Sequence, residues 1–150
     1  MEKTIKQIFK EYLEEQEKLL APRTYKYHQD AIAYLEHCLN GYGHSGLSEA
    51  DKKEFDEAYE KGVEFCDLFG PQILDAPNFA EFIGYFYPKK VACGRDAAKK
   101  VCGATINLYK WLIKNKYLLQ EEDGDEIELK EAVEYLRDTF KEGMEQYCNY

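Results

Sequence analysis

Apolar residues recur every three or four positions along most of the chain, the spacing that places them on one face of an α-helix. In the first segment Ile5, Ile8 and Phe9 make such a face, with lysines and glutamates on the other side. A second segment starts at Pro22, which suits the first position of a helix, and we expect Asn40 and the glycine after it to end that helix. The pattern therefore predicts two successive helices at the start of the chain.

The middle of the chain is expected to form one further helix and a short apolar turn. Ser48 can cap a helix that ends at the Gly70-Pro71 pair. One side of this helix would carry Phe55, Tyr59, Val63 and Cys66. The stretch NFAEFIGYFY follows, and we expect it to form a short apolar turn that ends at Pro88.

The stretch from Gly94 to Lys116 predicts a helix with two distinct faces. On a helical wheel its apolar residues fall within an arc of about 120°. These residues are Ala98, Val101, Cys102, Thr105, Leu108, Tyr109 and Leu112. The opposite side, named here the lysine face, carries Lys99, Lys100, Lys110 and Lys114, with Gly103 and Asn107 between them. Because the apolar stripe is long and flanked by aromatic residues, we expect this helix, near residues 95 to 115, to be central.

The end of the chain predicts an acidic helix over residues 125–147, capped by Asp125 with Glu128 three residues further on. Its apolar face would carry Leu129, Val133, Leu136, Phe140, Met144 and Tyr147. Its opposite face, named here the acidic stripe, carries Glu131, Glu134, Asp138, Glu142 and Glu145. Like charges along one face are mildly unfavourable, so either solvent or a cationic surface should meet the stripe. That surface could be the lysine face of the same molecule or of another copy.

These elements define the fold class. No run alternates apolar and polar residues for long enough to make a strand, no repeat is visible, and no linker rich in proline or serine divides the chain. A chain of 150 residues can form one core without a metal or a disulfide. The sequence predicts a single all-α domain over residues 1–150, a compact bundle of about five to six helices.

Charge is distributed unevenly along the chain. The formal net charge is −9, yet residues 89–116 contain eight basic residues and one acid, so this segment carries +7 and the other 122 residues carry −16. A solvated helix usually pairs glutamate with lysine four residues apart, and here the only acid is Asp96, near the helix start. The lysines therefore lack local partners. The low centre of the lysine face would let a phosphate backbone approach while lysines reach it from both sides.

Two stretches resemble the core-binding, SAM-like domain of tyrosine recombinases and phage integrases. LAPRTYKYHQDAIAYLEHCL, residues 20–39, is similar to the opening of that domain, and ATINLYKWLIKNKYL, residues 104–118, is similar to its last main helix. The matching positions are Pro22, Thr24, Tyr25, Ile32 and Leu35 in the first stretch and Leu108, Tyr109, Trp111, Leu112 and Lys114 in the second.

The resemblance implies a helical bundle that grips one side of a DNA duplex, mainly through phosphates. It covers about residues 5–39 and 76–118, with an insertion over about 41–74 that holds an extra helix near 48–69. It implicates the start of the second helix and the lysine face in DNA binding. With further basic residues of the charged segment, the candidate nucleic-acid-binding residues are Arg23, Thr24, Lys26, Lys89, Lys90, Arg95, Lys99, Lys100, Lys110 and Lys114.

The sequence shows no catalytic or metal-binding motif. Recombinase catalysis needs a nucleophilic tyrosine among arginines and histidine, but the chain has three arginines, no His-x-x-Arg motif and 32 residues after Leu118. His37, Cys38 and His44, which could join Cys66 or Cys93 around zinc, lack the spacing of a zinc site. The acids around Gly124 are out of phase with a calcium-binding loop. We therefore expect neither an enzyme nor a cofactor or metal site.

Five cysteines without a pairing pattern indicate reduced thiols, and no segment is apolar enough to span a membrane, so we expect a cytoplasmic protein.

Two functions remain open for this chain. The first function is a DNA-binding module, which the resemblance and the lysine face favour. The second is an acidic protein–protein interaction module that has lost nucleic-acid binding and could also self-associate through its terminal helix, which the net charge of −9 favours.

Overall fold

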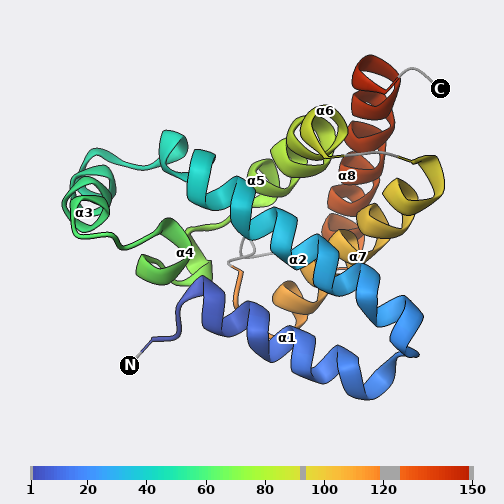
Figure 1. Cartoon of the computed structure of the whole chain (residues 1–150), viewed down its shortest axis with the longest axis horizontal. Coiled ribbons are helices and arrows are strands. Elements are labelled where there is room, and N and C mark those ends of the chain that lie inside the picture. Colours follow the sequence, from blue (N-terminus) through green and yellow to red (C-terminus); the bar gives the residue numbers. More distant parts are fainter. Residues whose placement is uncertain (1, 92–93, 119–125, 149–150) are drawn as a thin grey trace.

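The computed structural model describes residues 2–91, 94–118 and 126–148. Every regular element within these ranges is helical and none is a strand, so the all-α prediction is confirmed. The helices pack against one another in a compact bundle (Figure 1). Some of the predicted boundaries differ from the observed ones.

The first two helices lie antiparallel (Figure 1). α1 (Ile5–Leu19) is capped by Thr4, whose hydroxyl accepts a hydrogen bond from the first turn. α2 (Pro22–Tyr42) begins at its proline as expected but continues two residues beyond Asn40. The amide oxygen of Asn40 accepts a hydrogen bond of 2.9 Å from the backbone N–H of Cys66. The residue predicted to end the helix therefore makes a tertiary contact instead.

The prediction of one long helix after Ser48 is wrong in its second half. Ser48 caps α3 (Glu49–Glu60) as expected, but α3 ends early because Gly62 turns the chain with a left-handed φ of 82°. A single turn, α4 (Phe65–Leu68), follows. Tyr59 consequently does not enter the core and is 63% exposed. The segment is completed by the 3₁₀ turns η1 (Gly43–Gly46) and η2 (Pro71–Ile73).

The apolar stretch around Pro88 is a helical rod rather than a turn. It consists of α5 (Ala76–Glu81), the π-helical segment η3 (Phe82–Phe86) and α6 (Tyr87–Lys90). Pro88 has no N–H with which to continue the α-helical hydrogen bonds, and the preceding turn widens to the π pattern. The rod buries most of its aromatic residues, so it forms part of the core.

α7 (Arg95–Lys114) is the central helix, as predicted. It packs against α2 and against α8 (Glu126–Tyr147). Leu108 and Leu112 are 1% and 0% exposed. Burial extends beyond the predicted apolar stripe to Ala104, Ile106 and Trp111. Because neighbouring helices cover α7 on several sides, its exposed part is a narrow strip.

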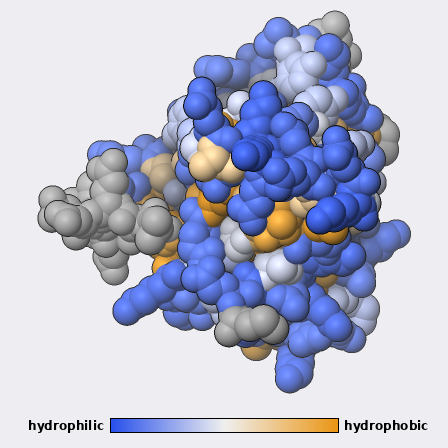
Figure 2. Space-filling view, turned by 90° about the vertical axis from the view of Figure 1, so that its left-hand side faces the viewer, coloured by the Kyte–Doolittle hydropathy of each residue, from blue (hydrophilic) through white to orange (hydrophobic). Residues whose placement is uncertain are grey.

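Apart from single turns, the described residues form six helical segments: α1, α2, α3, the rod of α5 to α6, α7 and α8. This number agrees with the predicted bundle of about five to six helices. None of these helices is both long and apolar enough to cross a lipid bilayer. On the face that Figure 2 shows, hydrophilic side chains surround small hydrophobic patches.

Candidate nucleic-acid interface

The exposed strip of α7 carries the lysine face. All four of its lysines are exposed, as the helical wheel predicts. Gly103, in the middle of the face, has no neighbouring atom within 4 Å of the position that a Cβ would take, and Asn107 is exposed as well. The centre of the face is therefore open between longer side chains, which is the shape that close approach of a phosphate backbone requires.

No carboxylate pairs with the lysine face within the described ranges, where ion pairs join Lys3 to Glu11 and Lys6 to Asp67. Lys100 Nζ lies 5.1 Å from the ring centre of Tyr27, in a cation–π contact. A neutral ring holds an ammonium group without cancelling its charge. The positive charge of the face thus remains available to a ligand.

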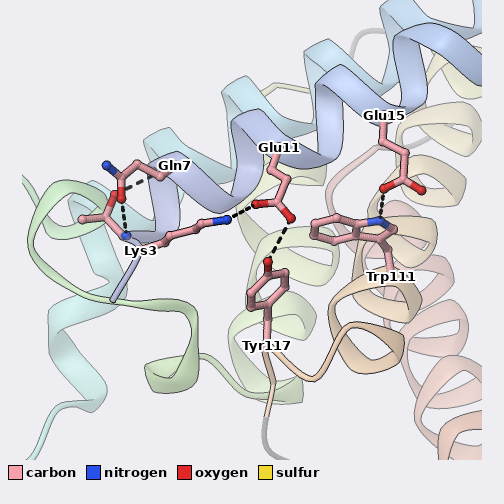
Figure 3. Close-up of polar contacts among 7 residues, drawn as sticks. Lys3, Gln7, Glu11, Glu15, Trp111 and Tyr117 are labelled. Atoms are coloured by element: carbon pink, nitrogen blue, oxygen red, sulfur yellow. Dashed lines mark hydrogen bonds and ion pairs between the residues drawn. The ribbon is translucent and has the colours of Figure 1, made fainter. Parts of the chain in front are cut away.

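Two acids of α1 are held by donors in the last turn of α7 and just after it (Figure 3). Trp111 Nε1 donates a hydrogen bond of 2.8 Å to Glu15, and Tyr117 Oη donates one of 2.9 Å to Glu11. Hydrogen bonds from Lys3 and Tyr117 hold the pKa of Glu11 below its usual value, so this carboxylate stays charged. These acids join α1 to the end of α7 instead of pairing with the lysine face.

A chain of hydrogen bonds anchors the centre of the lysine face to the core. Asn107 Nδ2 donates to Tyr12 Oη at 2.9 Å, and Tyr12 Oη lies 2.7 Å from Nδ1 of His28. Burial lowers the pKa of His28 and raises that of Tyr12, so both side chains are neutral near pH 7. Tyr12 then accepts from Asn107 and donates to His28, which connects α7, α1 and α2.

Arg23, Thr24 and Lys26 are exposed in the first two turns of α2. The contact between Tyr27 and Lys100 places this end of α2 beside the lysine face. The two groups of residues that the resemblance implicates therefore lie on neighbouring helices, within reach of one ligand.

Lys89 and Lys90 belong to a different surface. Lys90 Nζ lies 4.9 Å from the ring centre of Tyr42, at the opposite end of α2 from Tyr27. The length of helix between these two tyrosines is roughly 22 Å. Lys89 lies 5.2 Å from the ring centre of Tyr85. The structure thus does not bring this pair of lysines to the lysine face.

α8 adds basic residues that sequence reasoning did not single out. Lys141 of α8 lines a cavity of about 660 Å³ together with Arg95 and Lys99 of α7. Burial raises the pKa of the Cys102 thiol to about 12, and the charge of Arg137 opposes this rise, which places Arg137 near α7. Arg137 and Lys141 are four residues apart and so share a side of α8, a signal that the surrounding acids obscure in the sequence.

The acidic stripe of α8 is exposed at all five positions, as predicted. Among the described residues of α7 and α8, none of its carboxylates forms an ion pair with the lysine face. Glu145 comes near, since it lines the same cavity as Arg95 and Lys99. The structure therefore does not show the acidic stripe in contact with the lysine face of the same molecule. A contact between the two surfaces in different molecules stays a prediction.

In the part of the chain that the structure describes, no three His, Cys, Asp or Glu side chains gather closely enough to hold a metal ion. Cys38 and Cys66 are buried, and burial raises the pKa of the Cys38 thiol to about 12. The ring of His44 stacks on that of Phe55, with the two planes 4° apart. Cys93, the acids around Gly124 and the predicted cap Asp125 lie outside the described residues.

The fold and the site define a class of protein: an all-α bundle with a lysine face on its central helix that is exposed and forms no ion pair among the described residues. In comparisons with known proteins, no protein-family model, curated protein or solved structure matches the chain. The resemblance to the recombinase core-binding domain and its SAM-like arrangement therefore stays a prediction.

Proposed function

We propose that this protein is a non-catalytic helical module that binds duplex DNA, in the manner of the recombinase core-binding domain that it resembles. The observation that carries the proposal is the lysine face, with four exposed cations around an open centre and no ion-paired carboxylate in the described chain. A lysine ammonium group contacts phosphate through its charge and does not recognise individual bases, so binding should show little sequence preference.

The net charge of −9 is compatible with this proposal. At physiological salt, charges separated by more than about 8 to 10 Å are largely screened from one another. A phosphate at the lysine face therefore responds mainly to the cations around it. Arg23 and Lys26 on α2, and Lys141 on α8, add further positive charge at the edges of the same face.

We also place the protein in the cytoplasm, with no part in a membrane. Free cysteines at Cys38, Cys66 and Cys102 are buried, and thiols of this kind are typical of proteins in a reducing compartment.

The proposal is tested by reversing Lys99, Lys100, Lys110 and Lys114 to glutamate and titrating a blunt DNA duplex by fluorescence anisotropy. Binding should be lost, because four phosphate partners become four repelling charges. For the unchanged protein, log Kd against log salt should have a slope that corresponds to several released counterions. Circular dichroism checks that the exposed substitutions leave the helices intact.

A matched control reverses four other exposed lysines, on or beside α1 and α3: Lys10, Lys52, Lys53 and Lys61. This variant changes the net charge by the same amount. Equal losses in the two variants would mean that total charge alone governs binding, and the lysine face would have no special role. Absence of binding by the unchanged protein at low salt would overturn the proposed function.

A second candidate function is a protein–protein interaction module. The observation that favours it is the acidic stripe, five exposed carboxylates along one face of α8 that form no ion pair in the described part of the chain. Such a face is complementary to a basic surface, and the lysine face of a second copy is one. The resulting contact would join copies head to tail.

A further inference from the structure

A groove lined by aromatic rings lies between the C-terminal half of α2, α3 and α6. Its volume is about 950 Å³. Named here the aromatic groove, it has among its lining residues Tyr34, His37, Tyr42, Tyr59, Phe86 and Lys90. The lysine face does not extend to this groove, because Lys90 contacts the opposite end of α2 from Lys100.

Two tyrosines of the aromatic groove, on different helices, expose ring surface that the core does not use. Tyr59 of α3 is 63% exposed and Tyr42 of α2 is 37% exposed. The ring of Tyr59 contacts Phe55, with 5.7 Å between centroids, and Tyr59 lines the groove. A single exposed aromatic residue is common, but two on the walls of one concave surface indicate a binding site for an aromatic or apolar group.

Lys90 decides which kind of group the aromatic groove can accept. Its ammonium group lies 4.9 Å from the ring centre of Tyr42 and 5.9 Å from that of Phe86, and it donates a hydrogen bond to the Tyr42 hydroxyl. Lys90 therefore takes the place that a cationic ligand would occupy on these rings, and its charge would repel one. A flat aromatic group that carries negative charge suits the groove better.

The rim of the groove offers hydrogen-bonding groups for such a ligand. Asn40 Nδ2 donates a hydrogen bond of 2.8 Å to Glu64, which holds this carboxylate beside the groove rather than on Lys90. Glu64 can accept a hydrogen bond from an amino group, and the exposed imidazole of His37 can donate or accept one. Nucleobases present both kinds of partner at their edges.

We propose that the aromatic groove binds unpaired nucleotides, with a base stacked on the exposed ring of Tyr59 while Lys90, held at Tyr42, meets a phosphate. Inside a duplex each base is covered by its neighbours, so only an unpaired base can offer its face to this ring. The inference rests on the proposed nucleic-acid function and specifies the ligand further, as a duplex with a single-stranded extension. Duplex DNA lies on the lysine face, and a single-stranded extension reaches the aromatic groove roughly 22 Å along α2.

The test compares three probes by fluorescence anisotropy: a blunt duplex, the same duplex with an oligothymidine overhang, and oligothymidine alone. The overhang should raise the affinity of the unchanged protein for the duplex. Tyr59→Ala should weaken binding of the overhang duplex and of oligothymidine by roughly 5- to 150-fold, the range for loss of one stacked base. Binding of the blunt duplex should not change. Tyr59→Phe keeps the ring and should restore the affinity.

Tyr135→Ala is the matched control, because Tyr135 is also an exposed tyrosine, at 51%, but lies on α8 outside the aromatic groove. Equal effects of Tyr59→Ala and Tyr135→Ala would overturn the proposal. It would also be overturned if the overhang added no affinity, or if Tyr59→Ala weakened the blunt duplex as much as the overhang duplex.

The same titrations separate this proposal from the duplex function on which it builds. If the unchanged protein binds oligothymidine through Tyr59 but binds no blunt duplex, the duplex function fails and the groove remains a site for single strands. If it binds the blunt duplex through the lysine face and Tyr59→Ala changes nothing, the groove proposal fails alone.

Discussion

At the scale of single residues, protonation of His28 should make the stability of the fold depend on pH. It is 8% exposed, and its Nδ1 lies 2.7 Å from the Tyr12 hydroxyl. Burial lowers its pKa, so the unfolded chain takes up a proton at a higher pH than the folded chain does. The stability that neutral His28 contributes is therefore complete above the ordinary histidine pKa of about 6.5 and is lost as the pH falls below it.

We expect the free energy of unfolding, measured with urea, to be smaller at about pH 5.5 than at about pH 7. His28→Gln keeps an oxygen acceptor for Tyr12 but does not titrate, so its free energy of unfolding should depend less on pH over this interval. Identical pH dependence in the variant and the unchanged protein would assign the effect to other groups.

Leu108 should be among the residues on which stability depends most. It is 1% exposed on the central helix, and truncation would leave a cavity that its packed neighbours cannot fill. Leu108→Ala should lower the free energy of unfolding by roughly 2 to 5 kcal/mol, measured by chemical denaturation. Leu19→Ala, at a position that is 69% exposed, removes the same atoms and should cost far less.

At the scale of elements, two glycines mark a close crossing of α8 and the rod of α5 to α6. A Cβ on Gly143 would overlap the backbone carbonyl of Gly84, and a Cβ on Gly84 would overlap the side chain of Thr139. The two backbones therefore meet directly, and this contact fixes how α8 lies against the core.

Gly143→Ala should destabilise the fold by about 1 to 3 kcal/mol, because backbone atoms cannot rotate away from the added methyl group. Gly103→Ala is the control, since open space surrounds that position on α7. In a helix interior alanine is favoured over glycine, so this change should stabilise the protein by about 0.5 to 1 kcal/mol. Chemical denaturation of both variants shows whether each change lowers or raises the free energy of unfolding. A stabilising Gly143→Ala would mean that the two elements do not approach so closely.

At the scale of the whole molecule, separated charge is the dominant feature. The lysine face and the acidic stripe lie on the adjacent helices α7 and α8, and both are exposed. If the stripe of one copy meets the lysine face of another, it competes with DNA for the same cations. Removing the stripe would then increase the affinity for DNA.

We expect that changing the five acids of the acidic stripe to glutamine raises the affinity for duplex DNA at low salt and abolishes any concentration-dependent association in sedimentation velocity. A matched set of glutamine changes on α3 removes the same charge: Glu49, Glu54, Asp56, Glu57 and Glu60. The stripe should have clearly the larger effect on both measurements. Equal effects would mean that the stripe is solvated surface and acts only through net charge.

Spacing along the chain was sufficient to predict the long helices and the exposure of their charged faces. Pro22 begins α2 and Ser48 caps α3, because a cap or a helix start involves neighbours within one turn. The periodicity of α7 placed Leu108 in the core and the lysine face in solvent, since the helix alone determines which residues share a side. These parts of the fold and of the candidate site are local in origin.

Only the tertiary structure decided which segments meet. Asn40, predicted to end α2, hydrogen-bonds Glu64 and Cys66 across more than twenty residues of chain. Lys90 and Lys100, ten residues apart in one basic segment, contact opposite ends of α2, whereas Lys141 of α8 joins Lys99. A sequence pattern shows which side of a helix is apolar but not which other helix covers it, because that depends on packing between residues distant in the chain.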